Sequence, residues 1–221
     1  MSQRDFKDAL YEQFARIGHA MSSPKRIELL ELLGQGEKSV DALAAHADLP
    51  VKNTSAHLRV LRQARLVERR REGTYLYYRL ADDKVIHFLK EMEELGRIRL
   101  AEVERVTNTY LRSRDELEPV TFGELRRLLK RAEITLIDVR PRDEYRAGHI
   151  PGAISVPVAE LRDHLHKIPK GREVIAYCRG PYCVYSVEAM ALLRRRGYRA
   201  RRVENGIPEW RALGLAVAIG E

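Results

Sequence analysis

The sequence is poor in cysteine and has no long apolar run. Its 221 residues include two cysteines, Cys178 and Cys183, which stand five positions apart. A framework of structural disulfides, such as small secreted domains use, is therefore excluded. The uncharged apolar segments fall far short of the roughly 20 residues that a membrane-spanning helix needs.

The N-terminus also lacks the apolar stretch of a secretory signal. Four charged residues interrupt the first ten positions, namely Arg4, Asp5, Lys7 and Asp8. A signal peptide needs an uninterrupted apolar segment at this place. We therefore expect a cytoplasmic protein without a membrane partner.

The composition is that of a globular protein with room for two domains. Hydrophobic residues make up 44% of the chain and charged residues 33%, which allows buried cores and argues against disorder. The length suits two domains of about 100 residues each. A polar segment over 114–119 ends in a proline and is expected to separate a domain of residues 1–115 from one of residues 116–221.

Positive charge is concentrated in one stretch of the N-terminal half. The chain has a formal net charge of +8, and residues 50–79 alone hold eight Lys or Arg against two acids. Such a stretch fits a polyanionic partner, above all double-stranded DNA. The alternative is a solvated basic surface on a domain that binds protein.

The N-terminal half has the pattern of a helix-turn-helix. Apolar spacing predicts a first helix over 4–20, and Ser23 with Pro24 opens a second one. A short helix and turn over 39–50 precede a helix over about 52–65, whose N-terminal end is expected to enter a major groove. The candidate DNA-contacting residues are Lys52, Asn53, Thr54, Ser55, His57 and Arg59, and those expected to face the core are Val51, Ala56, Leu58, Val60 and Leu61.

Residues 66–80 predict two β-strands around a Glu-Gly turn, which together form a wing. Arginines and hydroxyl groups of a wing lie against the phosphate backbone, where they add affinity without reading sequence. The candidate residues are Arg70, Arg71, Thr74 and Tyr75.

Residues 84–114 carry apolar residues at helical spacing and predict one long amphipathic helix. Its apolar stripe offers more surface than a small winged domain can cover. We expect it to form a dimer interface together with the first helix. Packing against the second domain is the alternative, and both can hold.

Four motifs of the N-terminal half stand in a characteristic order. They are Ser23-Pro24-Lys25-Arg26, Ser39-Val40, Ser55-Ala56-His57-Leu58-Arg59-Val60-Leu61 and Gly73-Thr74-Tyr75-Leu76-Tyr77-Tyr78-Arg79-Leu80. In order and spacing they resemble the ArsR family of repressors over residues 10–90. The resemblance implies a homodimer that binds DNA and whose DNA affinity changes when a ligand binds.

The resemblance does not extend to a metal site. Metal-sensing members of the family carry a cysteine pair in the place that residues 37–43 occupy here, and this segment has no cysteine. A carboxylate and imidazole site formed by Asp82, Asp83 and His87 is formally open. Isolated histidines of this kind are more often surface or packing residues, so we expect no metal.

From Val120 onward the pattern changes to short helices alternating with apolar strands. A helix over 121–131 and strands over 134–139, 174–177 and 200–203 imply an α/β domain with a mostly parallel sheet. The predicted fold is therefore a multidomain one, a mainly α-helical winged helix-turn-helix followed by an α/β domain.

A cysteine stands where the second of these strands ends. Cys178 is followed by a short loop and then by a helix over about 184–195. The backbone N–H groups of such a loop, and the N-terminus of the helix, point at the sulfur and stabilise an anion there. We therefore expect a lowered pKa for Cys178 and a stable thiolate or persulfide, with Arg179 adding positive charge nearby. The candidate loop residues are Arg179, Gly180, Pro181 and Tyr182.

Further motifs surround this loop in the sequence. They are Ile137-Asp138-Val139-Arg140, Glu144-Tyr145, Gly148-His149-Ile150-Pro151-Gly152-Ala153-Ile154 and Gly206-Ile207-Pro208-Glu209-Trp210. Together with the cysteine loop they resemble the rhodanese family over residues 119–218. The resemblance implies that Cys178 attacks a small sulfur donor, carries its outer sulfur as a persulfide and yields it to a thiol acceptor, with no cofactor. It also implies that Asp138 and Arg140 lie near the base of the loop, while His149 and Trp210 are scaffold.

Two positions of the loop depart from the common rhodanese pattern. Pro181 stands where glycine is frequent, and Cys183 stands where arginine or threonine is frequent. Substrate preference is therefore not carried over. Cys183 is a candidate resolving residue that closes a disulfide or polysulfide with Cys178, and a small packed residue is an alternative of equal weight.

Three functions are compatible with these patterns. The favoured one is a DNA-binding regulator whose rhodanese domain senses or delivers reactive sulfur. The second is a sulfurtransferase whose DNA-binding domain serves autoregulation or recruitment. The third is a redox sensor or arsenate reductase that uses the cysteine pair, whereas a phosphatase is disfavoured because its loop is longer and ends in an arginine.

Overall fold

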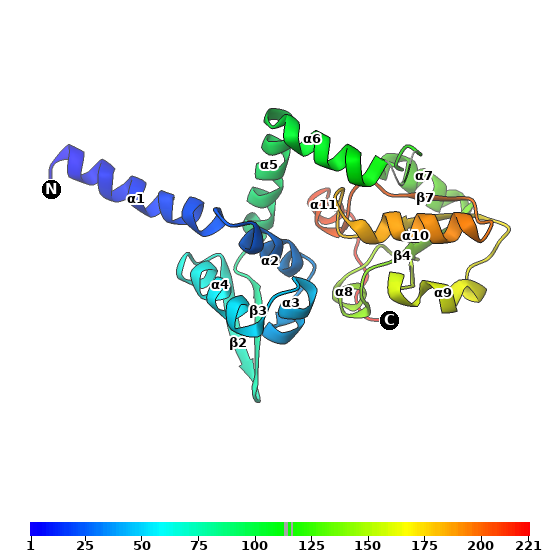
Figure 1. The fold of residues 1–221 in the computed structure, drawn as a ribbon, viewed down its shortest axis with the longest axis horizontal. Coiled ribbons are helices and arrows are strands. Elements are labelled where there is room, and N and C mark those ends of the chain that lie inside the picture. The colour runs from blue at the N-terminus through cyan, green and yellow to red at the C-terminus, as the bar shows by residue number, and fades with distance from the viewer. Residues whose placement is uncertain (113–114, 116) are drawn as a thin grey trace. The chain divides into compact units, whose positions relative to one another are not determined.

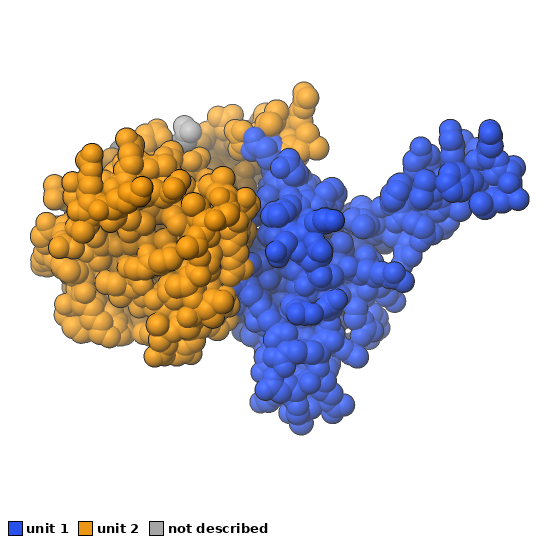
Figure 2. All heavy atoms as spheres, turned by 180° about the vertical axis from the view of Figure 1, so that it is seen from behind, with its two compact units in different colours: residues 1–94 blue, residues 95–221 orange. Residues whose placement is uncertain are grey.

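The computed structural model describes residues 1–112, 115 and 117–221, and the chain divides into two compact units, residues 1–94 and 95–221 (Figures 1 and 2). The expected domain boundary after residue 115 involves residue 116, which lies outside the described residues. That boundary stays a prediction. Within the described residues no helix is both long enough and apolar enough to cross a membrane.

Unit 1 is a mainly helical winged helix-turn-helix, as predicted (Figure 1). Its helices are α1 (Gln3–Met21), α2 (Pro24–Gly34), α3 (Val40–His46), α4 (Val51–Gln63) and the start of α5 (Asp83–Arg99). Its strands are β1 (Lys38–Ser39), β2 (Val67–Glu72) and β3 (Tyr75–Leu80). Strands β2 and β3 form the predicted hairpin, and β1, which was not predicted, pairs with β3 at its other edge.

Local chemistry explains where the helices of unit 1 begin. The hydroxyl of Ser39 accepts a hydrogen bond from the backbone N–H of Ala42, 3.2 Å away, and so caps α3. Pro24 occupies the first turn of α2, where its missing N–H costs nothing. The leucines of α2, α3, α4 and α5 then meet in one core, which includes the fully buried Leu29, Leu43, Leu58, Leu61 and Leu89.

Helix α1 buries little of its apolar surface within the chain. Only Ala20 and Met21, at its C-terminal end, are buried. The predicted apolar positions nearer the N-terminus of the helix are exposed. Among them are Phe6, which is 52% exposed, and Phe14, which is 62% exposed. The helix extends away from the remainder of unit 1 in Figure 1.

The single long helix expected over 84–114 is wrong. Helix α5 ends at Arg99, Leu100 has an extended backbone with φ −112° and ψ 102°, and α6 (Ala101–Thr107) follows. A π-helical turn (Asn108–Arg112) continues it, while residues 113 and 114 lie outside the described residues. The N–H of Leu100 still bonds the carbonyl oxygen of Gly96, and its own carbonyl oxygen accepts from Val103. The interruption therefore loses few hydrogen bonds, and no proline marks it in the sequence.

Unit 2 contains the predicted α/β domain with a parallel sheet. The strands are β4 (Ile134–Asp138), β5 (Ile154–Ser155), β6 (Glu173–Tyr177) and β7 (Ala200–Arg202), in the order β5-β4-β6-β7. All neighbouring pairs are parallel. Every residue of β4 is buried, which explains the apolar run in the sequence. The short edge strand β5 was not predicted.

Helices cover both faces of this sheet. One apolar core lies under α7 (Phe122–Arg131) and α11 (Ile207–Ala212), and the other lies under α9 (Leu161–His164) and α10 (Val184–Arg195). Helix α8 (Arg142–Ala147) follows β4, and two 3-10 turns (Val158–Glu160 and Leu165–Lys167) flank α9. The loop between β6 and α10 thus leaves the middle of the sheet at its carboxyl edge, where ligands of parallel sheets bind.

Candidate functional site

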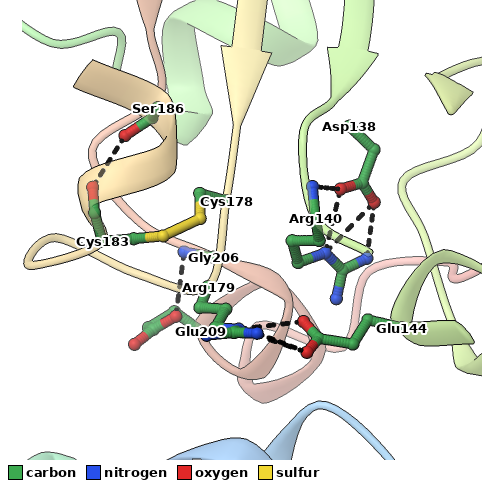
Figure 3. The surroundings of a disulfide bond; sticks show 9 residues. All are labelled: Asp138, Arg140, Glu144, Cys178, Arg179, Cys183, Ser186, Gly206 and Glu209. Carbon is green, nitrogen blue, oxygen red and sulfur yellow. Dashed lines mark hydrogen bonds and ion pairs between the residues drawn. A yellow bond between two sulfur atoms is a disulfide. The ribbon is translucent and has the colours of Figure 1, made fainter. Parts of the chain in front are cut away.

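Cys178 and Cys183 stand at the two ends of the loop between β6 and α10. Cys178 directly follows the buried β6, and Cys183 is the N-cap residue of α10. The two form a disulfide, with their Cα atoms 6.2 Å apart (Figure 3). Both are buried, at 2% and 9% exposure. The two sulfur atoms are thus within bonding reach of each other, which a resolving role for Cys183 requires.

Hydrogen bonds fix the far side of this loop. The N–H of Cys183 donates to the carbonyl oxygen of Gly180, 3.2 Å away, and closes a turn. The hydroxyl of Ser186 donates to the carbonyl oxygen of Cys183 at 3.1 Å. Gly180 is buried, whereas Pro181 is half-buried and Tyr182 is 37% exposed. Solvent therefore meets the loop at Pro181 and Tyr182.

Arg179 is held by Glu144 of α8. Its Nε and Nη2 atoms donate to the two carboxylate oxygens at 3.0 and 2.7 Å, and its guanidinium lies 5.1 Å from the ring centre of Tyr185. The Glu144 side chain is fully buried and that of Arg179 is 12% exposed. In Figure 3 the guanidinium points at Glu144 and away from the disulfide.

This pairing corrects the expectation that Arg179 adds positive charge beside Cys178. Its charge is compensated by a buried carboxylate, and its role in the structure is to tie the first residue of the loop to α8. In the sequence, Glu144 stands out only as part of the motif Glu144-Tyr145, which assigns it no role. Its place in that motif was the available signal.

Asp138 and Arg140 form a second buried ion pair, at the carboxyl end of β4. Asp138 lies opposite Tyr177 in the sheet, next to Cys178. The Nε and Nη2 atoms of Arg140 donate to Asp138 at 3.0 and 2.6 Å, and Nη2 also donates to the carbonyl oxygen of Gly148. Burial lowers the pKa of Arg140, but the charge of Asp138 and the hydrogen bonds to it more than offset this effect, so the pKa of Arg140 is raised. The pair fixes the base from which the loop departs.

Tyr177 completes this buried base. Its ring lies 5.5 Å from the Arg140 guanidinium, and its hydroxyl accepts a hydrogen bond from the N–H of Ile150 at 3.1 Å. Burial raises the pKa of Tyr177 well above its ordinary value, so the phenol stays neutral. The residues that precede Cys178 are therefore held rigidly from several sides.

Gly206 closes the loop from the side of α11. A Cβ atom at this position would overlap the carbonyl group of Arg179 and lie 2.8 Å from the carbonyl oxygen of Cys178. Its N–H donates to the carboxylate of Glu209, 2.9 Å away (Figure 3). The glycine is therefore required by close approach of two backbones. In the sequence, Gly206 is recognisable as part of a motif, but its contact with residues 178 and 179 is not.

His149 and Trp210 pack as parts of the core. The ring of His149 stacks on Tyr145 with centres 3.7 Å apart, and its Nδ1 lies 2.9 Å from the carbonyl oxygen of Tyr145. Trp210 meets Phe122 edge to face at 5.1 Å and donates from Nε1 to Ala216. Both contacts are those of structural residues.

Helix α4 presents a mixed set of the expected DNA-contacting residues. Lys52, Asn53 and Arg59 are exposed, and Ser55 and His57 are half-buried. Thr54 is a correction, because it is fully buried and its hydroxyl bonds the carbonyl oxygen of Pro50 at 3.2 Å. It cannot reach a base. Two residues expected in the core, Val51 and Ala56, are exposed instead.

The wing arginines differ from one another in their surroundings. Arg70 donates to both oxygens of Glu37 at 2.8 Å, is paired with Glu72 and lies 4.5 Å from the ring centre of Tyr77. The hydrogen bonds that Arg70 donates to Glu37 and Glu72 raise the pKa of Arg70. Two carboxylates therefore compensate its charge, and its expected role as a phosphate ligand stays a prediction. Arg71, Thr74 and Tyr75 are exposed.

The carboxylate and imidazole site that the sequence left open is not formed. In the described part of the chain, no three side chains among His, Cys, Asp and Glu gather closely enough to hold a metal ion. One Asp82 carboxylate oxygen instead accepts the N–H of Lys84 at 2.7 Å.

Comparisons with known proteins agree with this arrangement. Residues 23–69 match the family described as bacterial regulatory protein, arsR family, and residues 121–213 match the rhodanese-like domain. The chain is 41% identical over 218 residues to the HTH-type transcriptional regulator Rv0324 of Mycobacterium tuberculosis, an alignment that covers 99% of this chain and 96% of that protein.

Two further relatives match the second half of the chain. A sulfurtransferase of Allochromatium vinosum is 33% identical over 96 residues, which cover 43% of this chain and 88% of that protein. The thiosulfate:glutathione sulfurtransferase of Homo sapiens is 34% identical over 104 residues, which cover 41% of this chain and 90% of that protein. The chain belongs to the ArsR family of DNA-binding transcriptional regulators and carries a rhodanese-like domain in its C-terminal half.

Proposed function

We propose that the chain is a homodimeric regulator that senses reactive sulfur through Cys178, with Cys183 as the resolving cysteine. The observation that carries the proposal is the disulfide between these two residues in the loop at the start of α10. A rhodanese-like domain that carries sulfur on one cysteine needs only a second thiol within reach to turn a persulfide into a lasting signal.

The chemistry can be written with thiosulfate as the donor. The Cys178 thiolate attacks the outer sulfur, the S–S bond of the donor breaks and sulfite leaves, so that Cys178 carries a persulfide. The Cys183 thiolate then attacks Sγ of Cys178, which forms the disulfide and releases hydrosulfide. Each thiosulfate thus oxidises the two thiols to one disulfide and yields one sulfite and one hydrogen sulfide. Two equivalents of a small thiol, such as glutathione, return the pair to its reduced form.

These states differ in charge at the N-terminus of α10. A thiolate or persulfide carries a negative charge, which the helix N-terminus stabilises, whereas the disulfide is neutral. The buried ion pairs Asp138–Arg140 and Glu144–Arg179 hold the loop from beneath, so a change in sulfur state moves the loop and α10 rather than its base. The proposed signal is this local rearrangement.

Helix α1 supports the homodimer. Phe6, Leu10 and Phe14 recur every four residues and are exposed along one side of the helix. A groove of about 320 Å³ between α1 and α4 has Ala15, Ala20, Val60 and Ala64 among its lining residues, so large side chains have space to enter. Exposed apolar stripes of this kind mark protein interfaces. A second copy offers the same stripe and the same groove.

The dimer is tested by sedimentation of the full chain. The double variant Phe6→Glu/Phe14→Glu places charge on the stripe and is expected to sediment as a monomer. Leu213→Glu changes an equally exposed leucine of unit 2, at 63% exposure, and is expected to leave the dimer intact. A monomeric wild type, or a dimeric stripe variant, contradicts this assignment.

The sensing role is tested by DNA binding. The purified chain is reduced and titrated against the DNA upstream of its own gene, with and without thiosulfate or a persulfide donor. We expect the donor to change the affinity of the wild type and to leave Cys178→Ser unchanged. Cys183→Ser is expected to gain one sulfur atom in its mass without forming a disulfide. If donors leave the DNA affinity of the wild type unchanged, the proposed sensing is wrong.

A second candidate function is that of a sulfurtransferase. It is favoured by the likeness of the second half to two proteins named as sulfurtransferases. The test is continuous release of sulfite from thiosulfate in the presence of glutathione, which Cys178→Ser should abolish. Turnover in a protein whose DNA affinity does not change with the sulfur donor favours the sulfurtransferase function. The absence of turnover with any donor excludes that function.

A further inference from the structure

Most of the net positive charge lies in unit 2. Residues 1–94 hold 16 Lys or Arg against 15 Asp or Glu, whereas residues 95–221 hold 24 against 17. The basic stretch over 50–79 is therefore nearly cancelled by acids elsewhere in unit 1. The unit without the helix-turn-helix has a formal charge of +7. A domain that binds only small sulfur compounds has no need of such a charge.

The cations of unit 2 divide into two groups. In the first, arginines are bound to acids, as Arg140 is to Asp138, Arg179 to Glu144 and Arg201 to Glu124 and Glu173. The second group is exposed and forms no ion pair within the described part of the chain. Seven members of this group lie on the segments that lead into β4, β6 and β7, namely Lys130, Arg131, Lys170, Arg172, Arg195, Arg196 and Arg199. We name these seven residues the amino-edge cluster.

The topology brings the amino-edge cluster to one end of the sheet. Its members end α7 just before β4, precede β6, or connect α10 to β7. In the sheet Ile134 lies opposite Glu173, and Val174 lies opposite Ala200. Because parallel neighbours start about 4.8 Å apart, the starts of the three strands lie within about 10 Å. The cluster is thus at the opposite end of the sheet from Cys178, which follows the carboxyl end of β6.

Direct contacts join the connecting segments of this edge. The N–H of Val174 donates to the carbonyl oxygen of Arg199 at 2.8 Å. The ammonium group of Lys170 lies 5.8 Å from the ring centre of Tyr198. The segments before β6 and before β7 therefore form one continuous surface.

Little negative charge offsets the cluster. The segments 130–134, 170–173 and 195–200 contain two acids, Glu133 and Glu173, and Glu173 is engaged by Arg201. The C-terminal ends of α7 and α10 each contribute about half a negative charge through the helix dipole. Together with Glu133 these offset about two of the seven positive charges, so a strong positive field remains.

We infer that the amino-edge cluster is a second DNA-contacting surface, which binds the phosphate backbone of the duplex that flanks the operator. The winged helix-turn-helix already brings this chain to DNA, so the covalently linked unit 2 meets flanking phosphates at high effective concentration. Arginines bind phosphate oxygens in a forked geometry and need no particular base sequence. This surface is independent of the sulfur chemistry, because it lies away from the cysteine loop.

The experiment measures how DNA affinity of the full chain depends on salt. The cluster variant is Arg172→Gln/Arg199→Gln, and the matched control is Arg142→Gln/Arg146→Gln. The control removes the same charge from exposed arginines of unit 2 that are paired with Glu160 and Glu221. Thermal melts followed by Trp210 fluorescence establish that both variants remain folded.

Two duplexes from the region upstream of the chain's own gene are compared, one of about 20 base pairs that spans the half-sites of a dimeric helix-turn-helix and one of about 60. On the long duplex, each protomer of the dimer should lose two phosphate contacts, and the four lost contacts should reduce the slope of log affinity against log salt by about 3.6. The wild-type advantage over the cluster variant should then shrink by about two orders of magnitude between roughly 50 and 200 mM salt. On the short duplex, and for the control on both duplexes, the wild-type slope is expected.

Three results overturn the inference. A cluster variant with the wild-type slope on the long duplex means that the cluster binds no phosphates there. An equal loss on the short duplex means that the substitutions act on the helix-turn-helix. If the cluster variant keeps the wild-type salt slope of DNA binding but no longer binds vesicles of anionic phospholipid, the cluster contacts a lipid surface instead.

Discussion

Replacing Glu144 by glutamine tests whether the loop is held by a buried charge. The substitution keeps the shape of the side chain and removes the negative charge that both donor groups of Arg179 contact at 3.0 and 2.7 Å. The Glu144 side chain is fully buried and Arg179 is 12% exposed, so the arginine is left with a charge that water hardly reaches.

The expected cost follows from this burial. Breaking a buried ion pair by removing one partner destabilises a protein by about 3 to 5 kcal/mol, because the other charge remains uncompensated. The slight exposure of Arg179 favours the lower end, about 3 kcal/mol. In a domain of about 100 residues this corresponds to a fall in Tm of roughly 15 °C. An uncompensated Arg179 should also lower the pKa of the reduced Cys178 thiol.

The assay uses the single tryptophan of the chain, Trp210, which lies in unit 2 and reports its unfolding by fluorescence. The control is Glu160→Gln, which breaks the arginine pair with Arg142 in the same unit, where the side chains are 39% and 44% exposed. Solvent screens that pair, so little change is expected. Alkylation rates across pH report the Cys178 pKa in the reduced protein.

The reasoning is refuted if both substitutions cost the same, or if Glu144→Gln costs less than about 1 kcal/mol, the range of exposed pairs. The double variant Glu144→Gln/Arg179→Gln adds a second check. Because it removes both charges, it should be less destabilised than the sum of the single variants. Additive losses mean that the two groups are not coupled.

Two other substitutions follow from the geometry. Gly206→Ala places a Cβ atom on the Arg179 carbonyl and is expected to destabilise unit 2 by about 1 to 3 kcal/mol in tryptophan-detected unfolding. Gly123→Ala in α7 should be neutral or slightly stabilising, because its Cβ atom would meet only Oγ1 of Thr121, at 3.9 Å. In the wing, Arg71→Gln removes one phosphate contact from each protomer and should reduce the salt slope of DNA binding by the dimer by about 1.8. Arg70→Gln should leave the slope unchanged, because Glu37 and Glu72 already compensate the charge of Arg70. Equal losses in either pair contradict the reasoning.

The sequence predicted the elements around the site because their signals are local. The helix after Cys183 was expected over 184–195, and α10 has these bounds. The buried strand before Cys178 was recognisable as an apolar run, and the short helix expected within 39–50 is α3. Patterns of periodicity and capping need only neighbouring residues, so they survive without knowledge of the fold.

The prediction that Thr54 contacts DNA is wrong, and the sequence of the helix already argued against it. Its hydroxyl suggested a DNA contact, but Thr54, Leu58 and Leu61 stand at positions i, i+4 and i+7 and therefore share one face of the helix. That face is the buried one. The prediction rested on the polarity of Thr54, whereas the position of a residue around the helix axis decides whether its side chain is buried.

Local sequence patterns could not predict the ion-pair partners of Arg70 and Arg179. Glu37 is 33 positions from Arg70, and Glu144 is 35 positions from Arg179. Only the folded chain brings these carboxylates to the arginines and cancels charges that the sequence displays as free. The interruption at Leu100 is hidden for another reason, because an apolar stripe continues across it without a proline.

If the state of Cys178 and Cys183 changes the DNA affinity of the DNA-binding unit, α10 is the element that can transmit this change within unit 2. The helix begins directly after Cys183 and has Arg194 in its last turn. Its 12 residues span about 18 Å. There Nη1 of Arg194 lies 2.8 Å from the carboxylate of Asp115, which is buried and also lies 3.4 Å from Nε of Arg202. Asp115 belongs to the segment that leads back toward the N-terminal unit.

Asp115→Asn should therefore uncouple the two activities. We expect its reduced form to bind DNA as the wild type does and its Cys178 and Cys183 to form the disulfide with a sulfur donor, while the change in DNA affinity on donor addition shrinks toward none. Glu160→Gln, which weakens the Arg142 pairing in the same unit, is the control and should keep the full response. A full response in Asp115→Asn excludes this route, whereas a wild type without any response refutes the sensing itself. The two measurements thus separate the route of the signal from its existence.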